Sequence, residues 1–410
     1  MNNTPELLSP AGDLDKMRFG IAYGADAVYM AGTRFGMRAA ATNFDDNALR
    51  EGIAYAHAHG VKCYITVNIM PSNRDLPALP AYLELLQDAG ADALIIADVG
   101  VLRMARRYAP RVPVHISTQT SILNHEAANY WADEGAERIV LARELSLEEI
   151  AEIRAKTPKE LEIEAFVHGA MCISYSGRCL ISQYMTGRDA NHGACAQPCR
   201  WNYSLMEEKR PGQFFPVEED GRGTYLYNSK DMCMIEHVPE LIEAGITSFK
   251  IEGRNKTAYY AACVTGAYRA AIDAYRKDPN GFVLPQFCRD EVNKVSHREY
   301  YTGFYFGNQE NGQHYGDSQY IREYEVVGMP VECDDSGKAV FALKNRFFDG
   351  EELELIQPGQ VPYVFRAENV TDDEGTKREL FNVPQMRVHF AFPFKVSEWA
   401  ILRKVKERPE

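Results

Sequence analysis

The chain has 410 residues, enough for one large barrel-type domain and a smaller second domain. It is 45% hydrophobic and 25% charged, as globular proteins are, and no stretch comes near the roughly 20 apolar residues that a membrane helix needs. The net charge of −13 argues against a protein that binds nucleic acid over its whole surface, although a local basic patch could still hold RNA.

The chain begins directly with a predicted strand. The segment Met1–Leu7 has no basic region, apolar core or cleavage site of an export signal. We therefore expect a cytoplasmic protein without a membrane partner.

One short pattern repeats along the first two thirds of the chain. A glycine and a small or polar residue precede a short apolar run, as in Gly24–Met30 and Gly90–Ile96. A glycine at the end of a helix supplies the left-handed turn before the next strand. Continuous apolar runs rich in β-branched residues are typical of parallel strands buried on both faces. The runs predict eight strands: Glu6–Ser9, Ala27–Met30, Cys63–Asn68, Ala93–Asp98, Val114–Thr118, Arg138–Ala142, Leu161–His168 and Ser248–Gly253.

Eight strand–helix units in residues 1–280 predict an α/β protein with a TIM-type (β/α)8 barrel. An open doubly wound sheet is the alternative, but no Gly-x-Gly-x-x-Gly motif follows the first strand. Nearly 80 residues separate the seventh and eighth predicted strands, so the loop after the seventh carries a large insertion, 169–246. Loops that follow barrel strands lie at the catalytic face.

The remainder of the chain predicts a second, smaller domain. A helix at Lys256–Lys277 is expected to close the barrel, and 281–318 reads as a turn-rich linker. Residues 319–410 predict a small antiparallel β-barrel or sandwich. Its expected strands are Tyr324–Val327, Val340–Leu343, Glu352–Ile356, Val361–Phe365 and Arg387–Phe390.

Four of the nine cysteines fall within 28 residues of the insertion. Their spacing is Cys172-x6-Cys179-x15-Cys195-x3-Cys199, and four thiolates suit either zinc or an iron–sulfur cluster. Structural zinc sites usually use tight cysteine pairs, and wide spacing fits the separated corners of a cubane better. Inert buried thiols are the remaining alternative.

The residues around the first two cysteines resemble a motif of the collagenase-like peptidase family, whose catalytic type is unassigned. The matching positions are Glu164, Phe166, Gly169, Ala170, Met171, Cys172, Gly177, Cys179, Ile181 and Ser182. Further phrases similar to that family are Glu6–Gly12, Ser117–Thr120, Leu141–Leu145 and Lys250–Arg254.

This resemblance implies oxygen-independent hydroxylation rather than proteolysis. It implies a 4Fe–4S cluster on Cys172, Cys179, Cys195 and Cys199, prephenate as co-substrate, and an electron donor as a possible further partner. The length and the C-terminal β-domain resemble the branch that hydroxylates C5 of the wobble uridine in tRNA. The ribosomal-RNA branch is usually longer, and the ubiquinone branch generally lacks the C-terminal domain.

Polar residues at the predicted strand ends are the candidates for the site. Prephenate has two carboxylates, which arginine can hold through paired hydrogen bonds. The candidate substrate-binding residues are Arg38, Asn68, His115, Gln119, Arg143, Lys250 and Arg254. The candidate catalytic residues are Glu144, Glu252 and His168.

For RNA, the insertion offers Arg178, Arg188, Arg200 and Trp201 as phosphate and stacking contacts. Proteolysis is the rival class, and a thiol protease could pair Cys172 with His168. The chain has no His-Glu-x-x-His motif, since His125-Glu-Ala-Ala-Asn129 lacks the second histidine, and no Gly-x-Ser-x-Gly elbow. A non-catalytic RNA-binding scaffold is a third alternative.

Overall fold

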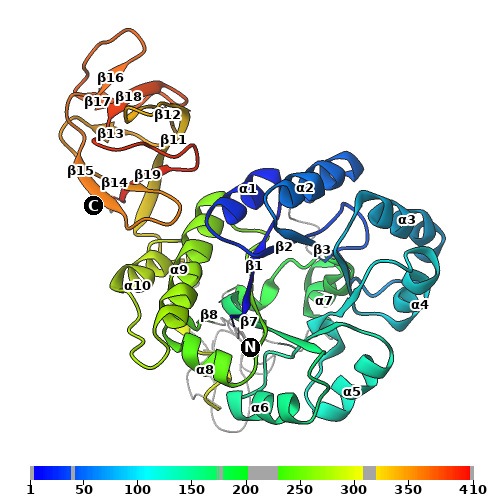
Figure 1. The fold of residues 1–410 in the computed structure, drawn as a ribbon. Helices are drawn as coiled ribbons and strands as arrows, with labels where there is room; N and C mark the ends of the chain where they lie inside the picture. The colour runs from blue at the N-terminus through cyan, green and yellow to red at the C-terminus, as the bar shows by residue number, and fades with distance from the viewer. Residues whose placement is uncertain are drawn as a thin grey trace, which may run out of the picture.

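A computed structural model describes residues 4–37, 42–172, 174, 179–201, 230–307 and 320–406. Within it, eight parallel strands close into a barrel (Figure 1), which confirms the predicted fold. The barrel closes because the last strand pairs with the first on one side, where Lys250 lies opposite Leu8, and with the seventh on the other, where Lys250 lies opposite Phe166. The barrel strands are β1(Glu6–Pro10), β2(Ala27–Met30), β3(Lys62–Val67), β4(Ala93–Ile96), β5(Val114–Ile116), β6(Arg138–Val140), β7(Glu162–Ala170) and β9(Ser248–Ile251).

Helices cover the outside of the barrel. Most begin at a side-chain cap, as at Asp13, Asp98 and Thr257, and Ser146 and Glu149 form a reciprocal capping box. The covering helices are α1(Leu14–Ala22), α2(Asp46–Ala58), α3(Leu79–Ala89), α4(Val99–Tyr108), α5(His125–Asp133), α6(Leu147–Ala155), α8(Val238–Glu243) and α9(Ala258–Lys277). Short 3-10 turns are Leu76–Ala78, Thr118–Thr120 and Ile235–His237.

Apolar side chains form two separate cores, one inside the barrel and one outside its wall. An apolar layer includes Leu8, Tyr29, Tyr64 and Ile95. The separate and much larger apolar core fills the space between the strands and their helices. This arrangement places the carboxyl ends of the strands around one mouth, as in barrel enzymes.

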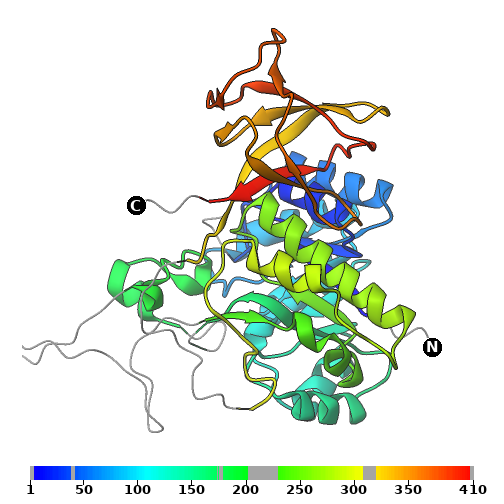
Figure 2. The ribbon, with the colours of Figure 1, turned by 90° about the vertical axis from the view of Figure 1, so that its left-hand side faces the viewer.

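The insertion after β7 lies at one end of the barrel, away from the described N-terminus (Figure 2). It contains α7(Ile181–Thr186) and the 3-10 turns Ala190–His192 and Pro198–Arg200. A strand that the sequence did not predict, β8(Asp231–Cys233), returns antiparallel to β7. The expected linker 281–318 holds α10(Gln286–Asn293) and β10(Tyr300–Tyr301), which pairs with β8.

The C-terminal domain is a curled antiparallel sheet with its own core. The main sheet has the order β15-β14-β19-β11-β12-β18-β16, and β13 pairs with β17. The strand β15 begins two residues later than expected, and β11 continues six residues beyond its expected end. The strands β13, β16, β17 and β19 were not predicted. The strands are β11(Tyr324–Cys333), β12(Lys338–Leu343), β13(Phe347–Phe348), β14(Glu352–Ile356), β15(Tyr363–Arg366), β16(Thr371–Asp372), β17(Leu380–Phe381), β18(Arg387–Ala391) and β19(Ile401–Val405).

The second domain packs against α1, α9 and α10. Arg403 of β19 is fully buried, and its guanidinium donates to Glu291 of α10 at 2.7 Å and Glu354 of β14 at 2.8 Å. Tyr23 of α1 donates to the carbonyl of Trp399 at 3.0 Å. No helix in the described ranges is both long and apolar enough to cross a membrane.

Candidate functional site at the barrel mouth

A cavity of about 140 Å³ lies at the mouth, between the strand ends and the insertion. Residues in or after seven of the eight barrel strands line it together with residues of the insertion, although they are far apart in the sequence. The predicted site residues that line this mouth cavity are Asn68, Gln119, Arg143, Lys250, Glu252, Arg254, Cys172, Cys179, Cys195 and Cys199.

Some polar atoms in the cavity wall have no protein partner. Among the described residues, Thr66 Oγ1, Gln119 Nε2 and Arg143 Nε are buried without a hydrogen bond. Thr66 and Gln119 are each 3% exposed. An unpaired buried polar atom costs about 1–3 kcal/mol, so these atoms indicate a polar ligand that would complete their hydrogen bonds.

Three cationic side chains line the cavity, and each is held by contacts with its neighbours. Lys250 Nζ lies 2.6 Å from Glu164 Oε1 and 4.4 Å from the centre of the Tyr29 ring. The Arg143 guanidinium stacks 4.1 Å from the centre of Phe166 and donates to the carbonyl of Ala170 at 3.2 Å. Arg254 donates to the carbonyl of Met37. The cavity wall therefore carries positive charges whose positions are fixed by hydrogen bonds, an ion pair and ring contacts.

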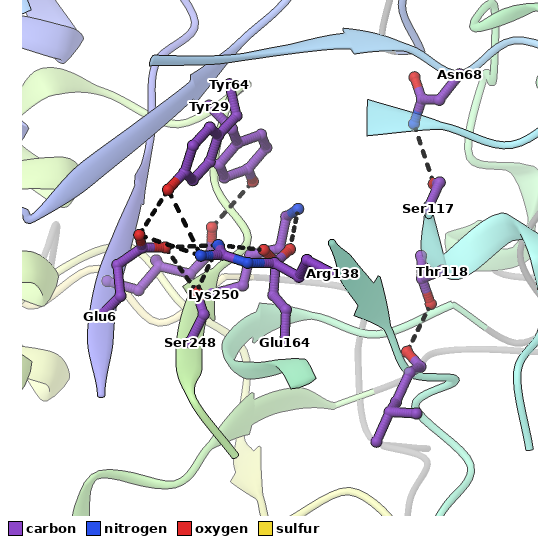
Figure 3. A network of polar contacts seen from close by, with 12 residues as sticks. Glu6, Tyr29, Tyr64, Asn68, Ser117, Thr118, Arg138, Glu164, Ser248 and Lys250 are labelled. Carbon is purple, nitrogen blue, oxygen red and sulfur yellow. Dashed lines mark hydrogen bonds and ion pairs between the residues drawn. The ribbon is translucent and has the colours of Figure 1, made fainter. Parts of the chain in front are cut away.

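Below the cavity, an ion network crosses the barrel interior (Figure 3). Arg138 is 2% exposed and lies 2.6 Å from Glu6 and 3.1 Å from Glu164. Ser248 also donates to Glu6, at 2.9 Å. Burial alone would raise the pKa of Glu6, but the ion pair with Arg138 and the hydrogen bonds to this carboxylate hold the pKa below its ordinary value of 4.5. This buried network joins β1, β6, β7 and β9 and ends at Lys250.

Side-chain and backbone contacts hold the cysteine-bearing segment 179–201 against the mouth. The Met70 N–H, after β3, donates to the carbonyl of Asn191 at 3.1 Å, and Asn191 Nδ2 donates to the carbonyl of Cys179 at 3.3 Å. The Ser182 hydroxyl accepts from the Ala196 N–H at 3.0 Å, beside Cys195. These contacts set the positions of Cys179 and Cys195.

The four cysteines fit a metal cluster in their chemistry. All four line the mouth cavity, and Gln197, with a left-handed φ of 58°, donates its N–H to Cys195 Sγ at 3.4 Å. N–H donation to sulfur is one of the means by which proteins tune iron–sulfur clusters. In the described part of the chain, no three cysteine, histidine or acidic side chains are grouped to hold one metal ion.

The structure does not bring every predicted residue to the cavity. His168 packs behind the barrel wall, where its Nε2 is 3.3 Å from Tyr300 Oη and its Nδ1 is 3.5 Å from Tyr268 Oη. His115 is buried inside the barrel against Tyr64, and Glu144 is half-buried after β6 without lining the cavity. Burial raises the pKa of Glu144. The position of His168 gives no support to a catalytic role or to a pair with Cys172.

The predicted RNA contacts are only partly described. Arg178 lies outside the described residues, as does the side chain of Arg200, and so does Arg38, which was predicted to bind the small substrate. Arg188 and Trp201 are exposed on the insertion and do not line the mouth cavity. Sequence reasoning left out Thr66 and Ser117, which do line it. Their signal was the same as for Asn68: a polar residue at the end of an apolar strand.

Two family profiles match the chain. Residues 12–315 match the profile described as "Peptidase family U32", and residues 322–403 match "Peptidase family U32 C-terminal domain".

Several relatives match most of this chain. The chain is 38% identical to "tRNA hydroxylation protein P1" of Bacillus subtilis, over 98% of this chain and 95% of that protein. It is 38% identical to "tRNA hydroxylation protein P" of Escherichia coli, over 86% of each chain. It is 36% identical to the Escherichia coli "23S rRNA 5-hydroxycytidine C2501 synthase", over 80% of this chain and 48% of that protein.

Proposed function

The chain belongs to peptidase family U32, and from this membership and the mouth cavity we propose that it is an RNA-hydroxylating enzyme that acts on tRNA. The finer proposal is that it hydroxylates C5 of the wobble uridine without oxygen, with prephenate as co-substrate. The observation that carries the proposal is that four cysteines, three cations and unpaired amide and hydroxyl atoms line one cavity. Two relatives that match the chain over most of its length are named for tRNA hydroxylation.

In this proposal Cys172, Cys179, Cys195 and Cys199 hold a 4Fe–4S cluster. When bound, such a cluster supplies electron transfer or an iron site for a substrate oxygen. An electron donor would then be a further partner.

The protein's own residues bind and orient the substrates. Lys250, Arg143 and Arg254 provide cations for the two carboxylates of prephenate, and arginine can hold a carboxylate through two parallel hydrogen bonds. Gln119 and Thr66 complete their hydrogen bonds on the bound molecule. Glu252, which lines the cavity, would accept or donate a proton in this proposal.

The test is mass spectrometry of nucleosides from total tRNA in a strain that lacks this gene and its relatives. We expect 5-hydroxyuridine derivatives to vanish, and the native gene to restore them. The variant Cys179→Ala should fail, whereas Cys333→Ala, in the C-terminal domain and away from the mouth, should succeed. Unchanged tRNA nucleosides in the deletion strain would overturn the proposal.

Metal analysis of the same purified variants tests the cofactor separately. We expect iron and sulfide in equal amounts in the native protein and in Cys333→Ala, with both reduced in Cys179→Ala. Stoichiometric zinc without sulfide would replace the iron–sulfur proposal with a zinc site.

Ribosomal RNA is the second candidate substrate. The observation in its favour is the 36% identity to an rRNA 5-hydroxycytidine synthase, of which this chain covers 48%. Nucleosides of 23S rRNA from the same strains decide between the two. Loss of hydroxycytidine with intact hydroxyuridine would favour this candidate.

A further inference from the structure

A second, larger cavity lies directly outside the mouth cavity, between the barrel and the C-terminal domain. Its volume is about 770 Å³, and we call it the outer cleft. The loop after β9 and the start of α9 form one wall, and β11 and the turn after β12 form the other. The two cavities share Arg143, Cys172, Cys195, Cys199 and Glu252. A molecule in the outer cleft therefore meets Arg143 and three of the cysteines before it reaches Lys250 and Arg254.

The outer cleft is positively charged on an acidic protein. Its described lining has five cationic side chains and two carboxylates, on a chain with a net charge of −13. Arg322, Lys344 and Lys406 are exposed, and all three belong to the C-terminal domain. Exposed cations concentrated in one cleft attract anions while the acidic remainder of the surface repels them.

Aromatic rings lie among these cations. Tyr320 has Lys256 at 4.3 Å, Arg298 at 4.9 Å and Arg322 at 5.7 Å from its ring centre. Tyr324 has Lys294 at 4.9 Å. A groove that combines cations for the backbone with aromatic side chains is typical of proteins that bind single-stranded nucleic acid. A small dicarboxylate would use only a fraction of this volume and charge.

We propose that the outer cleft binds the single-stranded loop of the RNA substrate, and that the C-terminal domain is thus a substrate-binding domain. Arg322, Lys344 and Lys406 contact phosphates, and one unstacked base passes inward beside the cysteines. A loop suits this geometry because its bases can be splayed out at low cost, whereas a paired base must first be extruded. This inference rests on the proposed function and names the surface that holds its substrate.

The test measures binding of an unmodified tRNA transcript to the full-length, metal-loaded protein at several salt concentrations. In the triple variant Arg322→Glu, Lys344→Glu, Lys406→Glu we expect affinity at least about tenfold weaker. The slope of log affinity against log salt should fall by about two to three, since each lost phosphate contact removes about one. The matched control reverses three exposed cations of the same domain that do not line the outer cleft, Lys338, Arg366 and Lys377. It changes the net charge equally and should bind like the native protein.

The outcomes separate this inference from the proposed function. If the control loses as much affinity as the triple variant, the effect is one of net charge and the inference fails. Native affinity in the triple variant, with tRNA hydroxylation lost in cells, would overturn the RNA assignment and indicate a docking site for a partner protein instead. If the native protein itself does not bind the transcript, the proposed function fails as well. Iron content and melting temperature should equal the native values in both variants, which establishes that they fold.

Discussion

At the residue scale, Glu164 supplies the negative charge that pairs with two cations inside the barrel. It is fully buried, and its carboxylate lies 2.6 Å from Lys250 and 3.1 Å from Arg138. Lys250 therefore lines the mouth cavity while its ammonium group is paired with the Glu164 carboxylate inside the barrel. A buried ion pair contributes little relative to apolar packing, but the loss of one partner is costly because the other charge stays buried.

We predict that Glu164→Gln destabilises the protein by about 3–5 kcal/mol, because it leaves two buried cations with too little negative charge. Urea unfolding measures the change. Lys250→Met should then cost much less in the Glu164→Gln background than in the native protein, since these residues are coupled. Additive effects in this double-mutant cycle would contradict the network.

His168 shows where reasoning from sequence fails. Strand alternation places residues 166 and 168 on the same face, and Phe166 does line the mouth cavity. The register between β7 and β9 shifts between these two residues, and such a bulge turns a side chain to a new direction. The pattern of apolar residues carries no sign of this shift. Burial first, and the nearby His297 and Lys256 second, lower the pKa of His168 to about 3.

We predict that His168 makes the protein less stable in mild acid. The unfolded imidazole gains a proton below its ordinary pKa of 6.5, whereas the folded one stays neutral down to about pH 3. Stability is therefore fully present above pH 6.5 and declines as pH falls, by about 2 kcal/mol at pH 5. Urea unfolding between pH 7 and pH 5 should show a shallower decline for His168→Gln. An unchanged decline would contradict the assignment.

At the element scale, the sequence predicted strands reliably where consecutive residues of a strand are all buried. All eight barrel strands were predicted because each is an apolar run buried on both faces, as in β2 and β4. The strand β8 was missed because its three residues owe their conformation to pairing with β7, more than 60 residues earlier. The choice of polar residues at predicted strand ends likewise identified Asn68, Gln119 and Lys250, which line the cavity. The sequence could not identify the side chains that contact them.

The end of β7 depends on Gly169. Its φ is +105°, and a Cβ there would lie 2.3 Å from the carbonyl oxygen of Glu252 and 3.1 Å from its carbon. That contact is with backbone, so it cannot be relieved by rotation of a side chain. Gly187 in the insertion has a φ of +70° and nothing described within 4 Å of its Cβ position.

We therefore predict that Gly169→Ala separates the ends of β7 and β9 and displaces Cys172 from Glu252. Gly187→Ala is the matched control, because it carries only the left-handed backbone cost of about 1–2 kcal/mol. Melting temperature and iron per chain measure the two effects. Gly169→Ala should lose more of both, and equal losses would show that the close approach of the strands does not matter.

At the scale of the whole molecule, the two domains share a buried polar contact. Arg403 joins Glu291 of the barrel side to Glu354 of the sheet, and Lys294 also lies 2.9 Å from Glu354. The Arg403 guanidinium is also within 3.1 Å of the Tyr259 hydroxyl of α9. This contact fixes the angle between the domains and hence the width of the outer cleft. The sequence predicted both domains, but it could not show their relative placement, which depends on contacts between residues far apart in the chain, such as Arg403 with Glu291 and Tyr23 with Trp399.

We predict that Arg403→Met loosens this contact, because Glu291 is then buried without its main cation, at a cost of about 3–5 kcal/mol. The radius of gyration from X-ray scattering should rise, and protease cleavage between the domains should become faster. Affinity for the tRNA transcript should fall although every cation of the outer cleft is retained. The double variant Arg403→Met, Glu291→Met removes the unpaired charge and should recover stability. If affinity recovers with it, the outer cleft needs only that the domains stay packed together; if affinity stays low while stability returns, Arg403 itself sets the angle at which the two walls hold RNA.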